Sequence, residues 1–366
     1  MRLNWVVVFT YLPFAFFALT MAAFVLRLRL GTRQQAIWAM VLLLGFSKFL
    51  CFDALGGHAF SPDLPELLIW GWDWLYSGAV ILCALSVLFF FRFRGKAYVL
   101  PVLAWSLSAW GLYNGVSVPA VHEVELAFDR LPAELDGYRI VQLADLHCSS
   151  AARRWRTQAI VDRTNALRPD LICLTGDNAD GRVSRIARHA EPLKELCARD
   201  GVFACTGNHE YYWEYREWRA SFYGKAENIR FLANECAFPR PELALGGVPD
   251  TVGVRKGLEE APDVRTAFAA ATNGEFRVLL QHQPKWAEES AREVGVDLQL
   301  SGHVHGGIAP GFRSYIEKFN GGFSRGAYRL GASILYVSPG CGQWAGFPMR
   351  FFNPSEITLI VLRRRP

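Results

Sequence analysis

The stretch Ser301-Gly302-His303-Val304-His305-Gly306-Gly307 follows Val296-Asp297-Leu298-Gln299-Leu300, a run typical of a short strand. Side chains alternate along a β-strand, so two histidines two positions apart point to the same side of it. The flanking glycines allow a sharp turn and a close approach to a ligand. A single His-x-His pair is more often structural than functional, so its interpretation depends on the other polar motifs of the chain.

Four more polar motifs each follow an apolar run of strand length. The runs cover residues 138–144, 171–175, 201–206 and 276–281, and the motifs are Asp145-Leu146-His147, Gly176-Asp177-Asn178-Ala179-Asp180, Gly207-Asn208-His209-Glu210 and His282-Gln283-Pro284. Buried parallel strands read as continuous apolar runs, and ligands bind beyond their carboxyl ends. Helices are predicted over 153–167 and 183–197. The pattern predicts an α/β domain with a metal site, because carboxylate, amide and imidazole groups together suit Mn, Fe or Zn better than Ca or Mg.

These five motifs resemble those of the calcineurin-like metallophosphoesterases, which read D-x-H, GD-x-x-D, GNH-[DE], a single His and GH-x-H. The resemblance covers roughly residues 121–362. A bacterial membrane-associated branch of the family also shares the later stretches Tyr336 to Gly342, Pro348-Met349-Arg350 and the strand-like run 356–362. Two positions depart from the pattern: Ile308 stands where Gln is common, and Gly181-Arg182 follows Asp180 where some members have Arg directly. Which arginine holds a phosphate is therefore left open.

The resemblance implies a four-layer α/β sandwich, in which two mixed β-sheets are flanked by helices, and a centre of two divalent cations. Carried over residue by residue, one cation would be held by Asp145, His147, Asp177 and His305, and the other by Asp177, Asn208, His282 and His303. A bridging carboxylate is required because two dications about 3.5–4 Å apart repel each other strongly unless an anion lies between them. A bridging water or hydroxide would attack phosphorus, His209 would protonate the leaving oxygen, and Asp180 would orient His209.

The first third of the chain has a different composition from the rest. Hydrophobic residues make up 51% of the 366, and the excess lies almost entirely before Pro119. Apolar runs over 5–26, 36–52, 67–91 and 97–113 predict four transmembrane helices. A cleaved signal peptide is the alternative for the first run, and a soluble helical bundle is the alternative for all four. We expect a membrane domain over residues 1–119 and a catalytic domain over 120–366.

Lys48 and Asp73 are the two charges inside these runs, and we interpret them either as a mutual ion pair or as side chains that reach the membrane interface. Lys and Arg cluster after the first and third runs (Arg27, Arg29, Arg33; Arg92, Arg94, Lys96). The loop 53–66 has three carboxylates and neither Lys nor Arg. Because basic loops stay in the cytoplasm, we expect a multi-pass inner-membrane protein with an extracytoplasmic catalytic domain. Arg2 is the one contrary charge.

A stretch of seven aromatic residues between Tyr211 and Tyr223 follows the Gly-Asn-His-Glu motif. Helical spacing favours core packing, and a rim that seats a lipid substrate is the alternative. The net charge of +5 is not clustered, so no nucleic-acid partner is expected.

Together these features predict a membrane-anchored two-metal phosphoesterase acting on a phosphomonoester, phosphodiester or pyrophosphate of an envelope or lipid-linked substrate. The alternatives are a catalytically inactive binding or scaffold protein, a channel or carrier with a regulatory domain, and a cytoplasmic-face enzyme similar to a UDP-diacylglucosamine pyrophosphatase. The residues that bind the rest of the substrate are not assigned.

Overall fold

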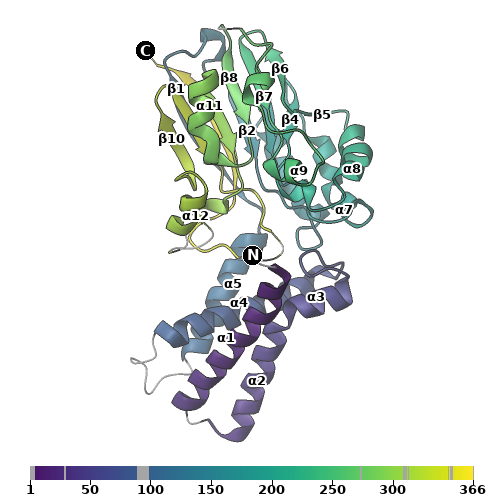
Figure 1. Ribbon diagram of the computed structural model, residues 1–366, viewed down its shortest axis with the longest axis vertical. Coiled ribbons are helices and arrows are strands. Elements are labelled where there is room, and N and C mark those ends of the chain that lie inside the picture. Colours follow the sequence, from purple (N-terminus) through teal and green to yellow (C-terminus); the bar gives the residue numbers. More distant parts are fainter. Residues whose placement is uncertain are drawn as a thin grey trace. The chain divides into compact units, whose positions relative to one another are not determined.

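A computed structural model describes residues 5–28, 30–88, 99–272, 274–307, 311, 313–344, 346 and 349–365. By its internal packing the chain forms two units (Figure 1). The first comprises Met1–Val116 with the short segment Ala345–Met349, and the second comprises Ser117–Trp344 with Arg350–Pro366. Several residues that the sequence analysis singled out lie outside the described part, namely Arg2, Arg29, Arg92, Arg94, Lys96, Ile308 and Pro348.

The first unit is helical. Its helices are α1 (Trp5–Leu28), α2 (Thr32–Phe46), α3 (Lys48–Gly56), α4 (Glu66–Leu88) and α5 (Val99–Val116). Among the described residues, α4 alone is long and apolar enough to cross a membrane, or two spans exist if the bent pair α2 and α3 counts as one. The span predicted over 36–52 is not one straight helix, because the chain bends by 55° between α2 and α3. The four predicted spans are thus supported only in part.

Lys48 and Asp73 form an ion pair inside the helical unit. Lys48 Nζ lies 2.5 Å from Asp73 Oδ1, and both side chains are fully buried. The ammonium group also donates a hydrogen bond of 3.0 Å to the carbonyl of Gly346, which belongs to the same unit. The rings of Phe49 and Tyr76 lie about it, with centroids 4.8 and 5.3 Å from Nζ. The structure therefore favours the ion pair over side chains that reach an interface.

The second unit contains two six-stranded sheets. The first has the order β1-β12-β2-β3-β4-β5 and the second the order β10-β11-β9-β8-β7-β6. Both are mixed, since β12 runs antiparallel to β2 and β10 runs antiparallel to β11, whereas most other neighbours are parallel. The strands are β1 (Ala120–Phe128), β2 (Arg139–Leu143), β3 (Leu171–Thr175), β4 (Val202–Cys205), β5 (Ile229–Phe231), β6 (Glu235–Arg240), β7 (Leu243–Gly247), β8 (Phe276–Leu280), β9 (Leu298–Ser301), β10 (Gly326–Leu330), β11 (Ser333–Val337) and β12 (Glu356–Arg364).

The α-helices of this unit are α6 (Arg154–Ala166), α7 (Val183–Ala190), α8 (Tyr215–Glu217), α9 (Thr251–Arg255), α10 (Val264–Ala267), α11 (Ala287–Val294) and α12 (Arg313–Phe319). Helices pack on the outer face of each sheet, with α6 and α7 on the first sheet and α10 on the second. The helix predicted over 183–197 stops early, and a 3₁₀ helix, Glu191–Glu195, follows it. Pro192 explains the change, because proline lacks the N–H that an α-helix needs.

Three apolar clusters separate four layers. The central cluster joins the two sheets and includes Leu171 of β3 and Leu300 of β9. A second cluster joins the other face of the first sheet to α6 and α7, and a third joins the second sheet to α10. The expected sandwich of two mixed sheets flanked by helices is confirmed for this unit. Its five motif-bearing strands therefore end in loops at the carboxyl edges of two facing sheets.

Candidate metal centre

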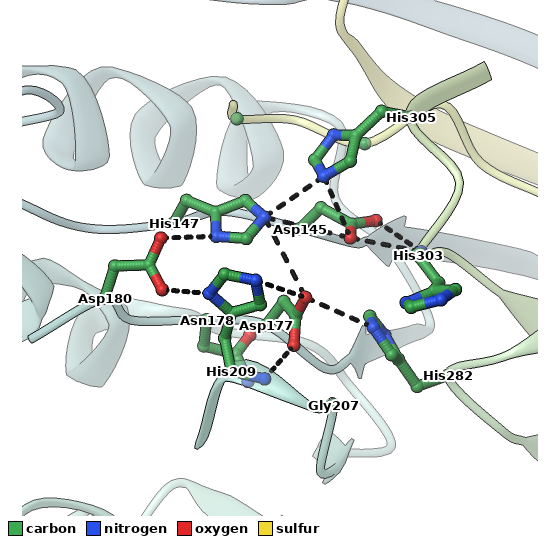
Figure 2. Close-up of polar contacts among 12 residues, drawn as sticks. Asp145, His147, Asp177, Asn178, Asp180, Gly207, His209, His282, His303 and His305 are labelled. Carbon is green, nitrogen blue, oxygen red and sulfur yellow. Dashed lines mark hydrogen bonds and ion pairs between the residues drawn. The ribbon is translucent and has the colours of Figure 1, made fainter. Parts of the chain in front are cut away.

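The five polar motifs meet at the carboxyl ends of β2, β3, β4, β8 and β9 (Figure 2). Within the described part of the chain, three groups of side chains have ligand atoms within 4.8 Å of one another. They are Asp145 with His147 and His305; His147 with Asp177 and His209; and Asp177 with His282 and His303. The first and third of these contain six of the seven residues that the resemblance implies as ligands.

The first group combines the ends of β2 and β9. His147 Nε2 and His305 Nε2 lie 3.2 Å apart, and Asp145 Oδ1 lies 4.0 Å from the former and 3.7 Å from the latter. Asp145 also accepts a hydrogen bond from the backbone N–H of His303, at 3.0 Å from Oδ2. Three ligand atoms thus converge on one point, and the carboxylate is held toward it.

The third group combines β3 with β8 and β9. His282 Nε2 lies 3.3 Å from Asp177 Oδ2. Its other ring nitrogen donates to the carbonyl of Thr175 at 2.7 Å, so the Nε2 lone pair is directed toward the carboxylate. Asp177 Oδ2 also lies 3.9 Å from His147 Nε2, which belongs to the first group. Asp177 is thus the carboxylate that reaches both groups.

Asp180 contacts two histidines at once. Its Oδ2 lies 2.8 Å from Nδ1 of His147, and its Oδ1 bonds to Nδ1 of His209. Both histidines therefore direct Nε2 away from Asp180, toward Asp177 (Figure 2). The structure places Asp180 against His209, where the sequence analysis expected it, and adds the bond to His147.

The backbone at the centre is held in an unusual conformation. Five of the eight described non-glycine residues with positive φ belong to the implied ligand set: Asp145, His147, Asp177, His303 and His305, with φ between 46° and 74°. Side chains with a β-carbon rarely adopt this region, and such strain concentrates at functional sites. The strained loops bring the side chains of short segments toward a common point.

Two glycines allow the loops to approach one another. A β-carbon on Gly207 would lie 2.2 Å from Asp177 Oδ1, and one on Gly302 would lie 2.4 Å from Asp145 Oδ2. Both separations are far below van der Waals contact. Any side chain at either position would displace a carboxylate of the centre.

Glu210 has a role that the sequence analysis did not assign. Its buried carboxylate accepts hydrogen bonds from the backbone N–H groups of Asp177, Asn178 and Gly207, at 3.0, 2.6 and 2.7 Å. It therefore ties the β3 loop to the β4 loop. The acidic residue that ends the Gly-Asn-His-Glu motif was the available signal.

Arg350 ends the Pro-x-Arg stretch, and the sequence predicted no role for it. It is almost fully buried, and its Nη2 lies 3.2 Å from Nδ1 of His305. The same nitrogen donates to the carbonyls of Pro339 and Gly342, each at 2.6 Å. Asn353 supports the same histidine by donating to its carbonyl. Arg350 therefore holds the His305 loop against the loop after β11, and its buried position argues for support rather than for phosphate binding.

The charged groups of the centre favour the binding of positive charge. Burial alone would raise the pKa of Asp177 and Asp180, but the neighbouring histidines hold both well below the usual value. Burial would likewise lower the pKa of His209, yet Asp180 and Asp177 raise it to about 9. The site therefore attracts cationic partners, whether protons or metal ions.

The donor atoms fit divalent cations. Asn208 Oδ1 and His282 Nε2 are buried with no hydrogen-bond partner among the described residues. Burying an unpaired polar atom is costly, so such atoms indicate an absent partner. The Nε2 atoms of His147 and His305 face each other at 3.2 Å, and a cation could take the place of the proton that they would otherwise share.

The aromatic stretch after Glu210 packs mainly into the core, as the favoured interpretation held. Its buried members are Tyr211, Tyr215, Trp218, Phe222 and Tyr223. Tyr212 is different, because 49% of it is exposed and its ring centroid lies 5.2 Å from that of His209. Cys173 and Cys205 are fully buried in the central cluster, where they pack as apolar residues.

Comparison with known proteins agrees with this geometry. The family model of the calcineurin-like phosphoesterases matches residues 138–307. A transmembrane protein with a metallophosphoesterase domain from Danio rerio is 33% identical over 268 residues, which cover 70% of this chain and 60% of the relative. An uncharacterized metallophosphoesterase of Helicobacter pylori is 33% identical over 258 residues, 69% of this chain and 66% of the relative.

A third relative, an uncharacterized metallophosphoesterase of Campylobacter jejuni, is 31% identical over 263 residues, 72% of this chain and 68% of its own length. The chain spans 60 to 66% of the length of the first two relatives. The matched family segment lies in the second unit and contains the ends of β2, β3, β4, β8 and β9 with their motifs. The chain therefore belongs to the calcineurin-like metallophosphoesterase family, and its second unit contains the family's domain.

Proposed function

We propose that this protein is a membrane-anchored phosphoesterase that hydrolyses a phosphate ester or pyrophosphate of an envelope or lipid-linked substrate with two divalent cations. The position of Asp177 carries the proposal. Its Oδ2 lies within 4 Å of ring nitrogens from both ligand groups, as a bridging carboxylate must.

One cation would be held by Asp145, His147, Asp177 and His305, and the other by Asp177, Asn208, His282 and His303. When bound, the two cations supply Lewis acidity toward the phosphoryl oxygens and activate water near neutral pH. Asp180 and the carbonyl of Thr175 fix the ring orientations of His147 and His282. Glu210 fixes the two loops that carry Asp177 and Asn208.

His209 supplies the proton for the leaving oxygen. Its Nδ1 is bound to Asp180, and its Nε2 lies 4.0 Å from Asp177 Oδ2, at the border of the centre. The side chain is 15% exposed, so a substrate oxygen has access to it. The raised pKa of about 9 keeps the ring protonated near neutral pH, which a general acid requires.

The alternative of an inactive binding protein has less support, because every residue type of the ligand set is present and the side chains converge. The membrane anchor is supported by α4 and by the relatives named as transmembrane proteins. The basic loops of the sequence support a multi-pass protein whose catalytic domain is extracytoplasmic. That placement favours exported lipids or envelope phosphodiesters over a nucleotide-linked precursor made in the cytoplasm.

Hydrolysis of bis-p-nitrophenyl phosphate by the purified full chain tests the activity. We expect turnover after loading with Mn²⁺, little after chelation, and little in Asp177→Asn under either condition. Glu123→Gln, an exposed carboxylate on β1, serves as the matched control and should behave as the wild type. A fully loaded protein that hydrolyses no monoester, diester or pyrophosphate would support the inactive binding protein instead.

Reporter fusions after Tyr113 and after Leu362 test the placement. Alkaline phosphatase should be active at both points, whereas a reporter that works only in the cytoplasm should be silent. Activity of the cytoplasmic reporter at Leu362 would overturn the placement and restore the cytoplasmic lipid precursor as the leading substrate.

A further inference from the structure

Tyr212 is an exposed aromatic side chain beside the candidate general acid. The other described members of its aromatic stretch are mostly buried, yet 49% of Tyr212 is exposed. Its ring meets that of His209 edge to face, with centroids 5.2 Å apart and planes at 66°. An exposed tyrosine in this position adds little to the core, and its ring is free to contact a ligand bound beside His209.

Trp344 approaches His209 from a different part of the chain, the loop after β11. Its ring centroid lies 6.2 Å from that of His209, with planes at 68°. Both separations lie within the roughly 4.5–7 Å over which aromatic rings attract one another. The acid is therefore bordered by two aromatic side chains that come from separate loops of the same unit.

Neighbouring groups hold Tyr212 in place. The ammonium group of Lys256 lies 5.0 Å from the centre of its ring and donates a hydrogen bond of 2.6 Å to the carbonyl of Tyr211. The ring is thus fixed between a cation and the acid before any substrate arrives, which lowers the entropy lost on binding.

We propose that Tyr212 and Trp344 form the leaving-group subsite, and that the site selects esters whose leaving group carries a planar ring next to the leaving oxygen. This inference rests on the proposed function, because His209 must protonate that oxygen. A leaving group bonded to that oxygen then lies against the side chains that border His209. A planar ring meets two aromatic partners there, whereas an alkyl group gains only contact area.

The test compares a phenyl ester with a hexafluoroisopropyl ester of the same phosphodiester, because the two leaving groups have similar acidity. In the full chain loaded with Mn²⁺, Tyr212→Ala should lower the phenyl-to-alkyl ratio of kcat/KM by about 2- to 12-fold. Tyr212→Phe keeps the ring and removes only the hydroxyl group, so the ratio should stay as in the wild type. Phe238→Ala, an aromatic residue of β6 with 45% exposure, is the matched control.

An equal loss on both esters in Tyr212→Ala would overturn the proposal, as would a ratio that falls as far in Tyr212→Phe as in Tyr212→Ala. If Tyr212→Ala does not fold, Trp344→Ala replaces it with the same expected change. Calorimetric titration with phenylphosphonate and methylphosphonate gives a readout without turnover. Preference for the phenyl compound should fall in the alanine variants. A wild type that hydrolyses neither ester but still prefers phenylphosphonate would defeat the proposed function and leave the subsite standing.

Discussion

Both units of the molecule bury charges, but they balance them differently. In the helical unit, one ammonium faces one carboxylate, and aromatic rings enclose the pair. In the metallophosphoesterase unit, the carboxylates of Asp145, Asp177 and Asp180 are surrounded by histidines, which carry charge only when protonated.

In the Lys48–Asp73 pair, which we call closed, the two charges cancel and the ammonium group also donates to the carbonyl of Gly346. The Asp73 oxygens make no further hydrogen bond in the described part of the chain, so the pair is balanced by charge. The centre at the strand ends leaves Asn208 Oδ1 and His282 Nε2 without hydrogen-bond partners in the described part of the chain. A buried polar cluster that its own residues do not complete is a binding site for what completes it.

The largest effect should follow from removing the shared carboxylate. Asp177→Asn takes away the charge that both ligand groups share, so occupancy of both cation positions should fall and turnover should drop about 10⁴-fold. Replacing His305 should mainly affect one position. Metal content per protein after purification provides the measurement, and full two-metal occupancy in Asp177→Asn would defeat the assignment.

Removing the acid should cost less and should spare the metals. His209→Ala should keep both cations and lose about 10²–10⁴-fold in turnover, the usual range for general acid catalysis. The loss should shrink for p-nitrophenyl esters, because a good leaving group needs little protonation. A loss that stays the same as leaving-group acidity varies would show that His209 acts in another way.

Asp180→Asn should shift the pH profile. The acid works when protonated, so turnover declines as the pH rises through the pKa of His209. Asp180 and Asp177 raise that pKa to about 9 against the opposing effect of burial. Without the charge of Asp180 the pKa falls, so the alkaline decline should begin at a lower pH. The measurement is turnover against pH with an ester that has a poor leaving group. Glu125 is an exposed carboxylate on β1, so Glu125→Gln should leave the pH of the decline unchanged.

Substitutions in the closed pair, Lys48–Asp73, should have the smallest effect on turnover. Lys48→Met leaves Asp73 buried and unpaired, which should reduce the stability of the helical unit by about 3–5 kcal/mol. The double variant Lys48→Met/Asp73→Leu should recover most of that loss, because an apolar pair needs no partner charge. Thermal unfolding in detergent checks the stability, and metal content should not change. A double variant as unstable as the single one would show that the charges themselves are required.

Much of the second unit was predictable because its signals are local. The ends of β2, β3, β4, β8 and β9 agree to within two residues with the ends of the strand-like runs predicted from the sequence. A polar motif follows each of these runs. Parallel strands place such motifs at one edge whatever the details of packing. Convergence therefore followed from strand order and needed no knowledge of individual contacts.

Features that depend on contacts between distant residues were not predictable. Gly45 and Ser47 are residue types that occur at helix kinks, but they do not by themselves distinguish a bent helix pair from one span. A β-carbon on Gly45 would lie 3.0 Å from the carbonyl of Leu75 in α4, so the bend lies where two helices pack closely. The bonds of Glu210 cross between two loops, and Arg350 reaches His305 from 45 residues away. Those contacts form only when the sheets are assembled.

The place of β12 in the first sheet has a consequence for biosynthesis. β12 (Glu356–Arg364) lies between β1 and β2, parallel to the former and antiparallel to the latter. It is also the last strand along the chain, so a ribosome completes every other strand of the unit before it releases this one. Until then β1 and β2 expose unpaired edges and a gap in the central cluster. Edges of this kind can pair with other chains. The nascent unit therefore needs to be protected by chaperones or by rapid completion of its synthesis.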